Sequence, residues 1–203
     1  LTNSISSSRG SSQATFRIVS PKHGNDDKSW SRFSSMLDSV SPSEVSHETY
    51  TPEEQRNFLQ RHGKFCYHTN TAVLERYDEL PNDSLKEQLF KYCILYTGRA
   101  NIFWDVSDVV LLQPLSEFLH LLQQNSAAIV VDTENLREEE NTEQETLIHS
   151  SFLFVSSKAP PVAKSMIQLL VETSNQVLAS SPLLLARQLS LYMEDDKAWA
   201  AWQ

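Results

Sequence analysis

The sequence holds few of the residues on which several common types of site depend. It contains only 4 glycines and 2 cysteines in 203 residues. Neither a glycine-rich phosphate loop nor the G-x-S-x-G elbow of serine hydrolases occurs, because both need glycines at fixed spacing. Cys66 and Cys93 form no C-x-x-C pair, which argues against a zinc site and against thioredoxin-like chemistry. They are interpreted as two buried thiols or as a disulfide in a secretory compartment.

Basic residues and long apolar runs are scarce as well. The 17 Lys and Arg residues against 26 Asp and Glu residues give a formal net charge of −9. Such a balance opposes non-specific binding to nucleic acid or to an anionic membrane, so no nucleic-acid partner is expected. No apolar run approaches the roughly 18–20 residues needed to cross a bilayer. Membrane association is therefore expected only through a segment outside this chain.

The first residues of the chain differ in composition from the rest. Residues 2–13 are rich in serine and have almost no apolar side chains, so residues 1–14 are predicted to be a disordered lead-in. The same composition would suit a stem that joins a Golgi enzyme to its membrane anchor. Residues 15–203 are predicted to form one α/β domain, either whole or truncated at its C-terminus.

Helix and strand patterns alternate along this domain. Thr51 and Glu54 form a capping box with a proline between them, which predicts a helix start. Asp83 is a candidate N-cap, and Gly98 supplies a left-handed helix end. The alternation predicts an α/β sandwich with a mostly parallel sheet. Helices are expected at residues 30–40, 52–62, 83–96, 116–124, 160–178 and 182–194, strands at 16–20, 101–104, 109–113, 127–131 and 151–155, and a polar acidic loop at 132–145.

Two aspartates, Asp105 and Asp108, lie between two predicted strands. Ligands of α/β sheets bind beyond the carboxyl ends of strands, and two carboxylates there can hold a divalent cation. Such a cation neutralises a diphosphate leaving group. Residues three apart do not share a face of a strand, so joint coordination requires a turn or bulge at residues 106–107. Because Asp and Ser are common turn formers, the alternative is a corner without a metal.

Residues 89–115 resemble the signature of the sugar-transferase family that carries a DXD sugar-binding region. This family includes initiation-specific α-1,6-mannosyltransferases and related capsular and sphingolipid glycosyltransferases. The match lies in the helix at 89–96 and in the V-V-L-L-Q-P-L run at 109–115. Counted back from Pro114, Asp108 falls on the second aspartate of the family motif. The departures are Gln88 and Lys91 for an aspartate and an arginine of the family helix, residues 99–101 for a Gly-Gly pair, and aspartates three apart instead of two.

The resemblance implies a GT-A-like, Rossmann-type single domain with a mostly parallel central sheet flanked by helices. It implies a hexosyltransferase, with mannosyl transfer as one case, that moves sugar from a GDP- or UDP-sugar to a glycan or glycolipid with retention of configuration. The compartment implied is the lumen of the Golgi or the secretory pathway. The resemblance makes Asp105 and Asp108 the ligands of Mn²⁺ or Mg²⁺, and it assigns nucleotide-sugar binding to Asp105, Asp108, Gln88, Lys91, Arg99 and His149.

His149 enters this set because it precedes a predicted strand that returns to the presumed cleft. The 6 histidines otherwise form no H-x-H or H-E-x-x-H pattern and are interpreted as surface or helix-end residues. No catalytic nucleophile or base is identified. The altered aspartate spacing leaves a second hypothesis, in which the chain is a catalytically inactive glycosyltransferase-like domain that binds a glycan or a protein partner.

Overall fold

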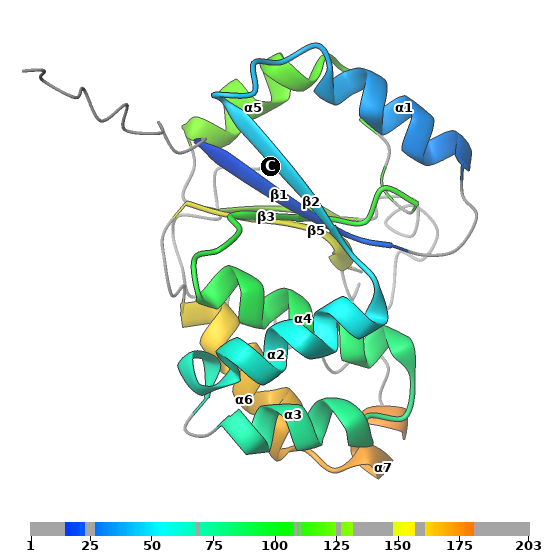
Figure 1. Ribbon diagram of the computed structural model, residues 1–203, viewed down its shortest axis with the longest axis vertical. Coiled ribbons are helices and arrows are strands. Elements are labelled where there is room, and N and C mark those ends of the chain that lie inside the picture. The colour runs from blue at the N-terminus through cyan, green and yellow to red at the C-terminus, as the bar shows by residue number, and fades with distance from the viewer. Residues whose placement is uncertain are drawn as a thin grey trace, which may run out of the picture.

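The computed structural model describes residues 15–22, 27–67, 70–107, 109, 111–124, 127–131, 148–156 and 161–180. In these residues the chain forms a single α/β domain of three layers, with one sheet between two groups of helices (Figure 1). The predicted lead-in, the acidic loop and the last predicted helix lie outside the described residues. The sheet has five strands in the order β2-β1-β3-β5-β4, which are β1 (Phe16–Pro21), β2 (Val45–Tyr50), β3 (Ile102–Trp104), β4 (Ala127–Val131) and β5 (Ile148–Val155).

The sheet is mixed, so the prediction of a mostly parallel sheet was wrong. β1 pairs in parallel with β2 and β3, whereas β5 pairs antiparallel with both β3 and β4. A parallel connection needs a crossover, usually through a helix, and the sequence predicts only a polar loop between β4 and β5. Two successive strands joined in that way pair antiparallel, as β4 and β5 do. Since β5 is also antiparallel to β3, β3 and β4 run in the same direction on either side of it.

Each face of the sheet carries its own layer of helices. On β3, the side chains of Ile102 and Trp104 join one core cluster and that of Phe103 joins the other, as expected for a strand buried on both faces. The helices α1 (Asp27–Leu37) and α5 (Leu115–Gln123) cover the first face (Figure 1). The second face is covered by α2 (Pro52–Cys66), α3 (Asn70–Glu79), α4 (Asp83–Tyr96), α6 (Pro161–Glu172) and α7 (Asn175–Ser180).

The predicted starts of α2 and α4 and the predicted end of α4 are confirmed to within one residue, whereas α2 runs four residues past its predicted end at residue 62. The backbone N–H of Glu54 donates to Thr51 Oγ1 at 3.3 Å, and that of Thr51 donates to Glu54 Oε2 at 2.8 Å, which completes the capping box. The N-cap of α4 is Asn82, one residue before the predicted Asp83, and its Oδ1 accepts from the N–H of Leu85. Gly98 ends the α4 region with a φ of 67°, as predicted for a left-handed stop.

The prediction of a strand at residues 109–113 was wrong. The described residues of this segment follow an irregular path, in which the N–H of Val109 donates to the Asp105 carbonyl at 3.1 Å. Trp104 Nε1 donates to the Val109 carbonyl at 2.9 Å, and Arg32 Nη2 donates to the Leu111 carbonyl. Side chains thus satisfy backbone groups that a sheet ladder would otherwise hold. Leu112 is 89% exposed, which no buried strand would allow.

Three further differences involve α3, β2 and the predicted helix at residues 160–178. Neither α3 nor β2 was predicted. The strand β2 is polar, and among the described residues it pairs with β1 alone. The predicted helix divides into α6 and α7. Arg76 of α3 donates to the carbonyls of Leu170 and Thr173, each at 2.7 Å, and so satisfies carbonyls at the end of α6.

Candidate functional site

Asp105 follows β3 at the carboxyl end of the strand and begins a tight corner. Its Oδ1 accepts from the N–H of Ser107 at 3.0 Å and from Ser107 Oγ at 2.6 Å. Its backbone N–H donates to the Ser151 carbonyl of β5 at 2.7 Å. The carboxylate is therefore fixed by short-range hydrogen bonds, and Asp105 is only 5% exposed. A turn at residues 106–107, which joint coordination with Asp108 would require, is present.

The structure brings Lys91 of α4 to this carboxylate. Lys91 is 0% exposed, and its Nζ lies 4.7 Å from the centroid of the Tyr92 ring and 5.5 Å from that of the Phe103 ring. Burial lowers the pKa of the Lys91 ammonium to about 7, while the negative charges of Glu87 and Asp105 raise it. Lys91 and Asp105 thus form an interacting pair of opposite charges between α4 and β3.

The other predicted site residues do not all lie near this pair. Gln88 is buried one turn before Lys91 on α4, so the two share a helix face. Arg99 is exposed and precedes β3, at the opposite end of the strand from Asp105. The Arg99 charge acts instead on His62, whose pKa is lowered first by burial and then by Arg99. His149 of β5 pairs with Val130 of β4, but its side chain lies outside the described residues, as does the whole of Asp108.

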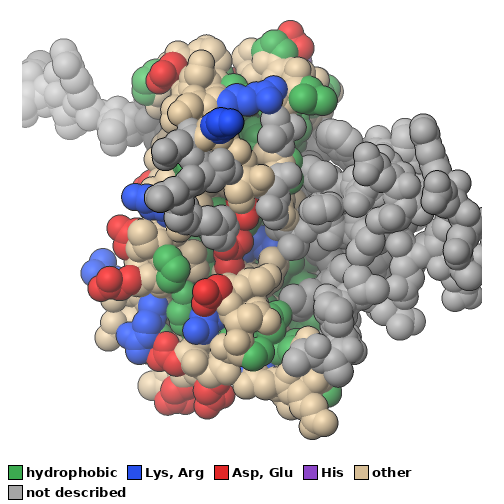
Figure 2. Space-filling view, turned by 90° about the vertical axis from the view of Figure 1, so that its right-hand side faces the viewer, with side chains coloured by type: hydrophobic (Ala, Val, Ile, Leu, Met, Phe, Trp, Pro, Cys, Tyr) green, Lys and Arg blue, Asp and Glu red, His purple; other side chains and the backbone are tan. Residues whose placement is uncertain are grey.

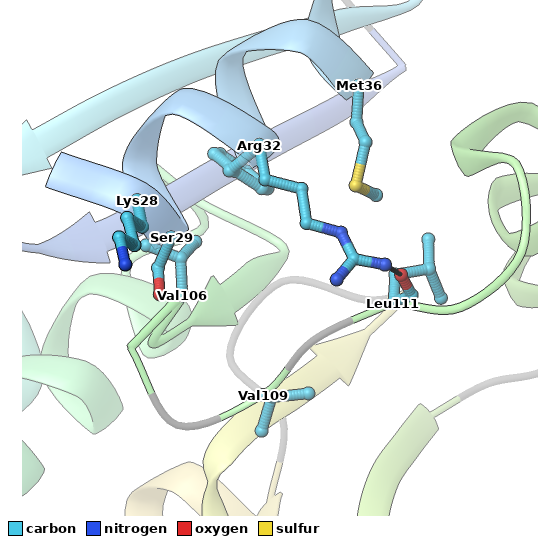
Figure 3. Close-up of a pocket in the computed structure, with 8 residues that line it drawn as sticks. Lys28, Ser29, Arg32, Met36, Val106, Val109 and Leu111 are labelled. Carbon is cyan, nitrogen blue, oxygen red and sulfur yellow. Dashed lines mark hydrogen bonds between the residues drawn. The ribbon is translucent and has the colours of Figure 1, made fainter. Parts of the chain in front are cut away.

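A crevice that was not predicted lies between α1 and the segment after β3. The chain leaves β1 towards β2 on one side and reaches β3 on the other, so β1 and β3 form the topological switch point of the sheet. Crevices beyond the strand ends at such points are the usual ligand sites of α/β sheets. A cavity of about 170 Å³ is present here (Figure 3). It is lined by Lys28, Ser29, Arg32, Phe33, Met36, Val106, Val109 and Leu111.

Basic side chains line this crevice on the α1 side. Lys28 and Arg32 are four residues apart and share one face of the helix, and Arg32 Nη2 donates to the Leu111 carbonyl at 3.4 Å (Figure 3). In Figure 2, which shows this side of the molecule, Lys and Arg side chains lie near the top, where α1 lies in Figure 1, and further Lys, Arg, Asp and Glu side chains are spread over the lower half. The predicted helix began at residue 30, which left Lys28 out. Only the four-residue spacing could have indicated this pair.

The size and position of the crevice limit what the described residues alone hold. Small-molecule sites usually span about 300–1,000 Å³, so a cavity of about 170 Å³ accommodates a phosphate group better than a whole nucleotide. Val106 packs in the core cluster on the α1 side of the sheet, whereas Asp105 interacts with Lys91 of α4 on the other side. A ligand that reaches both the crevice and the Asp105 carboxylate would lie across the carboxyl edge of the sheet.

A metal site is not complete within the part of the chain that the structure describes. No group of three or more His, Cys, Asp or Glu residues is placed there to hold an ion. At the corner after β3 the described residues supply one carboxylate, that of Asp105, and Ser107 already donates twice to one of its oxygens. Divalent cations take six or more ligands or keep several waters, so Asp105 alone does not make a site. The described residues alone therefore do not make a metal site.

His47 is a second buried titratable group near α1. Its Nε2 lies 3.1 Å from Ser20 Oγ of β1, and its ring packs against Phe33 and Trp30 at centroid distances of 4.9 and 5.8 Å. Burial lowers the pKa of His47 to about 4, against a smaller opposite effect of Glu48. The imidazole is therefore neutral near pH 7 and serves as a packing residue between β1, β2 and α1.

Among the described helices, none is long and apolar enough to pass through a lipid bilayer. Comparison of the chain with protein-family models, with curated proteins and with solved structures finds no match.

Proposed function

We propose that this chain is a GT-A-type glycosyltransferase domain whose nucleotide-sugar donor lies across the carboxyl edge of the sheet, between Asp105 and the α1 crevice. The observation that carries the proposal is the position of Asp105. It is a buried carboxylate directly after the central strand β3, at the topological switch point, and the next residue, Val106, lines a crevice with Lys28 and Arg32. The acceptor is a glycan or a glycolipid in the secretory pathway.

The charges near the crevice support an anionic ligand. Sugar transfer from a nucleoside diphosphate places negative charge on the departing diphosphate, and groups that stabilise this charge lower the barrier. The chain as a whole carries a net charge of −9, so a diphosphate requires cations nearby. Lys28 and Arg32 supply two, and Mn²⁺ or Mg²⁺ held by Asp105 and Asp108 is the proposed third.

In this proposal Lys91 and Gln88 are positioning residues. Lys91 is buried against Asp105 on the side away from the crevice, so it acts on the donor only through the carboxylate. Its interaction with Asp105 links α4 to the end of β3 and so fixes where the carboxylate lies. Arg99 is left out of the donor site because it lies at the other end of β3.

Binding of UDP and GDP with and without Mn²⁺ tests the donor site. We expect one nucleotide to raise the melting temperature in the presence of Mn²⁺, since a ligand at 100 times its Kd stabilises by about 2.7 kcal/mol. The double variant Lys28→Ala/Arg32→Ala should weaken nucleotide binding about 10-fold or more, given charge-assisted bonds of roughly 1.5–3 kcal/mol. Lys64→Ala, at an exposed lysine of α2, is the matched control and should bind as the parent does. Equal nucleotide affinity of the two variants would remove the crevice from the proposal.

Hydrolysis of the donor sugar tests catalysis separately. Asp105→Asn keeps the size of the side chain and its acceptor for Ser107 but removes the charge, so donor turnover should fall by at least roughly 100-fold if the carboxylate stabilises the transition state. Asp38→Asn, at an exposed position just after α1, is the control for loss of a charge. Unchanged turnover of Asp105→Asn, in a folded sample, would exclude Asp105 from the chemistry.

One observation favours the second candidate, a domain that binds a glycan or a protein without sugar transfer. Asp105 Oδ1 accepts two hydrogen bonds from Ser107, which is how an aspartate that only closes a corner behaves. Ser107→Ala separates the two roles. In a transferase it removes the hydroxyl hydrogen bond to the carboxylate, keeps the one from the backbone N–H of residue 107 and leaves metal-dependent nucleotide binding intact or stronger. A purely structural corner loses stability and binds no nucleotide before or after the change.

A further inference from the structure

The two cysteines of the chain lie side by side in the core, although they are 27 positions apart in the sequence. Cys66 is the last residue of α2 and Cys93 lies in α4. Cys66 Sγ lies 3.6 Å from the Cys93 carbonyl oxygen and also 3.6 Å from that of His62. The two helices pack closely here, since the rings of Phe58 and Phe90 meet edge to face at 5.5 Å.

The two thiols lie close together in the core. The pKa of the Cys93 thiol is raised by burial first, and then by a hydrogen bond with the Cys66 thiol and by its charge. Both residues belong to the same core cluster and are free thiols, with exposures of 5% for Cys66 and 0% for Cys93.

We propose that Cys66 and Cys93 are a site of disulfide formation that joins α2 to α4 when the protein meets a small disulfide oxidant such as oxidised glutathione. The inference does not depend on the proposed glycosyltransferase activity. It does bear on the same helix, because the disulfide would anchor α4 two residues after the buried Lys91.

The exchange begins at Cys66, which is the less buried thiol and ends its helix, where local opening is easiest. Its thiolate attacks one sulfur of oxidised glutathione, the glutathione S–S bond breaks, and one reduced glutathione leaves with the proton that Cys66 gave up. Cys93 then attacks the Cys66 sulfur of this mixed disulfide and releases the second reduced glutathione. The two cysteines lose two electrons and the oxidant gains them.

The experiment uses the full chain in its folded state, incubated with oxidised glutathione or with a reductant. We expect the oxidised chain to lose the mass of two hydrogen atoms and to resist alkylation after unfolding. A peptide pair that contains both cysteines should appear after proteolysis without reductant. A disulfide that closes a loop of 27 positions should raise the melting temperature by roughly 5–10 °C for a chain of this size.

Two outcomes would overturn the proposal. One is a chain whose two cysteines are both alkylated after exposure to the oxidant, and the other is a product that carries only glutathione adducts or links between two chains. The single variants Cys66→Ser and Cys93→Ser are matched controls, in which the oxidant should produce no rise in melting temperature. Since the mass and alkylation results come from the unmodified chain, they decide the question even if a variant fails to fold.

Discussion

At the scale of single residues, Lys91 and Asp105 are two buried residues of opposite charge that interact. A lysine with no exposure beside an aspartate with 5% exposure is stable only if the two charges compensate each other's loss of water. The pair joins α4 to the end of β3, so it also fixes where the Asp105 carboxylate lies. An energetic test of the pair therefore tests the geometry of the candidate site.

We expect Lys91→Met and Asp105→Asn to be coupled in a double-mutant cycle. Each single change removes one of the opposite charges that act on the other residue, although Glu87 still acts on Lys91, so the double variant should be less destabilised than the sum by about 1–3 kcal/mol. The measurement is the free energy of unfolding in denaturant. Lys86→Met, at a partly exposed lysine of the same helix, is the control and should be additive with Asp105→Asn. Additivity in the Lys91 cycle would contradict the interaction.

The buried His47 predicts how stability depends on pH. Its pKa is about 4 in the folded chain against 6.5 for the ordinary group, so as pH falls below 6.5 the unfolded state binds a proton that the folded state refuses. Its contribution is complete above pH 6.5 and is lost as pH falls towards 4. Near pH 5 the loss should be about 2 kcal/mol. The variant His47→Gln should show a smaller fall in unfolding free energy over the same range, and an equal fall would contradict the assignment.

At the same scale, the sequence predicted Asp105 at a functional corner because Asp, Ser and Asp between apolar runs favour a turn. It also singled out Lys91, but as a nucleotide-sugar-binding residue. The helix α4 carries polar residues on several sides, so the sequence did not show that Lys91 is buried. Lys28 and Arg32 were missed because their role depends on α1 lying across the end of β3. That contact joins segments more than 70 positions apart.

At the scale of elements, the link between α3 and α6 shows how one side chain replaces a helix cap. Arg76 donates to the Leu170 and Thr173 carbonyls from within the helical layer. The change Arg76→Met should lower the free energy of unfolding by about 2–4 kcal/mol, because two largely buried carbonyls lose charged donors. Circular dichroism with denaturant measures this.

The control for Arg76 is Arg56, which makes two hydrogen bonds to the Asp78 carboxylate on the surface at 2.8 and 2.7 Å. Exposed ion pairs contribute about 0–1 kcal/mol, so Arg56→Met should cost far less than Arg76→Met, although each arginine makes two hydrogen bonds. Similar costs for the two arginines would show that burial does not set the difference.

Elements with strong local signals were predicted well, and those that depend on tertiary contacts were not. The capping box of α2 and the Gly98 end of α4 are local chemistry and are confirmed. The polar strand β2 exists because its backbone pairs with β1 over six residues, and its side chains give little sign of that. At the break between α6 and α7 the Thr173 carbonyl accepts from Arg76, which is about 100 positions away in the chain.

At the scale of the whole molecule, the α/β class follows from alternation, whereas strand direction does not. Local patterns predict that a segment is extended, but only the connection decides whether it pairs parallel or antiparallel. The loop at residues 132–145 was the available signal for an antiparallel pair, and the general rule of a parallel sheet outweighed it. The domain is therefore parallel on the β2-β1-β3 side and antiparallel on the β3-β5-β4 side.

The shortness of β3 has a consequence for how this chain tolerates change. The strand has only three residues. It pairs in parallel with β1 on one edge and antiparallel with β5 on the other, and its side chains alternate between the two faces of the sheet. Removing or adding a single residue between Gly98 and Asp105 would turn the acid from the α4 face to the α1 face. Insertions and deletions should thus be tolerated far from this stretch and rejected within it. The length of the central strand therefore decides on which face of the sheet the carboxylate lies.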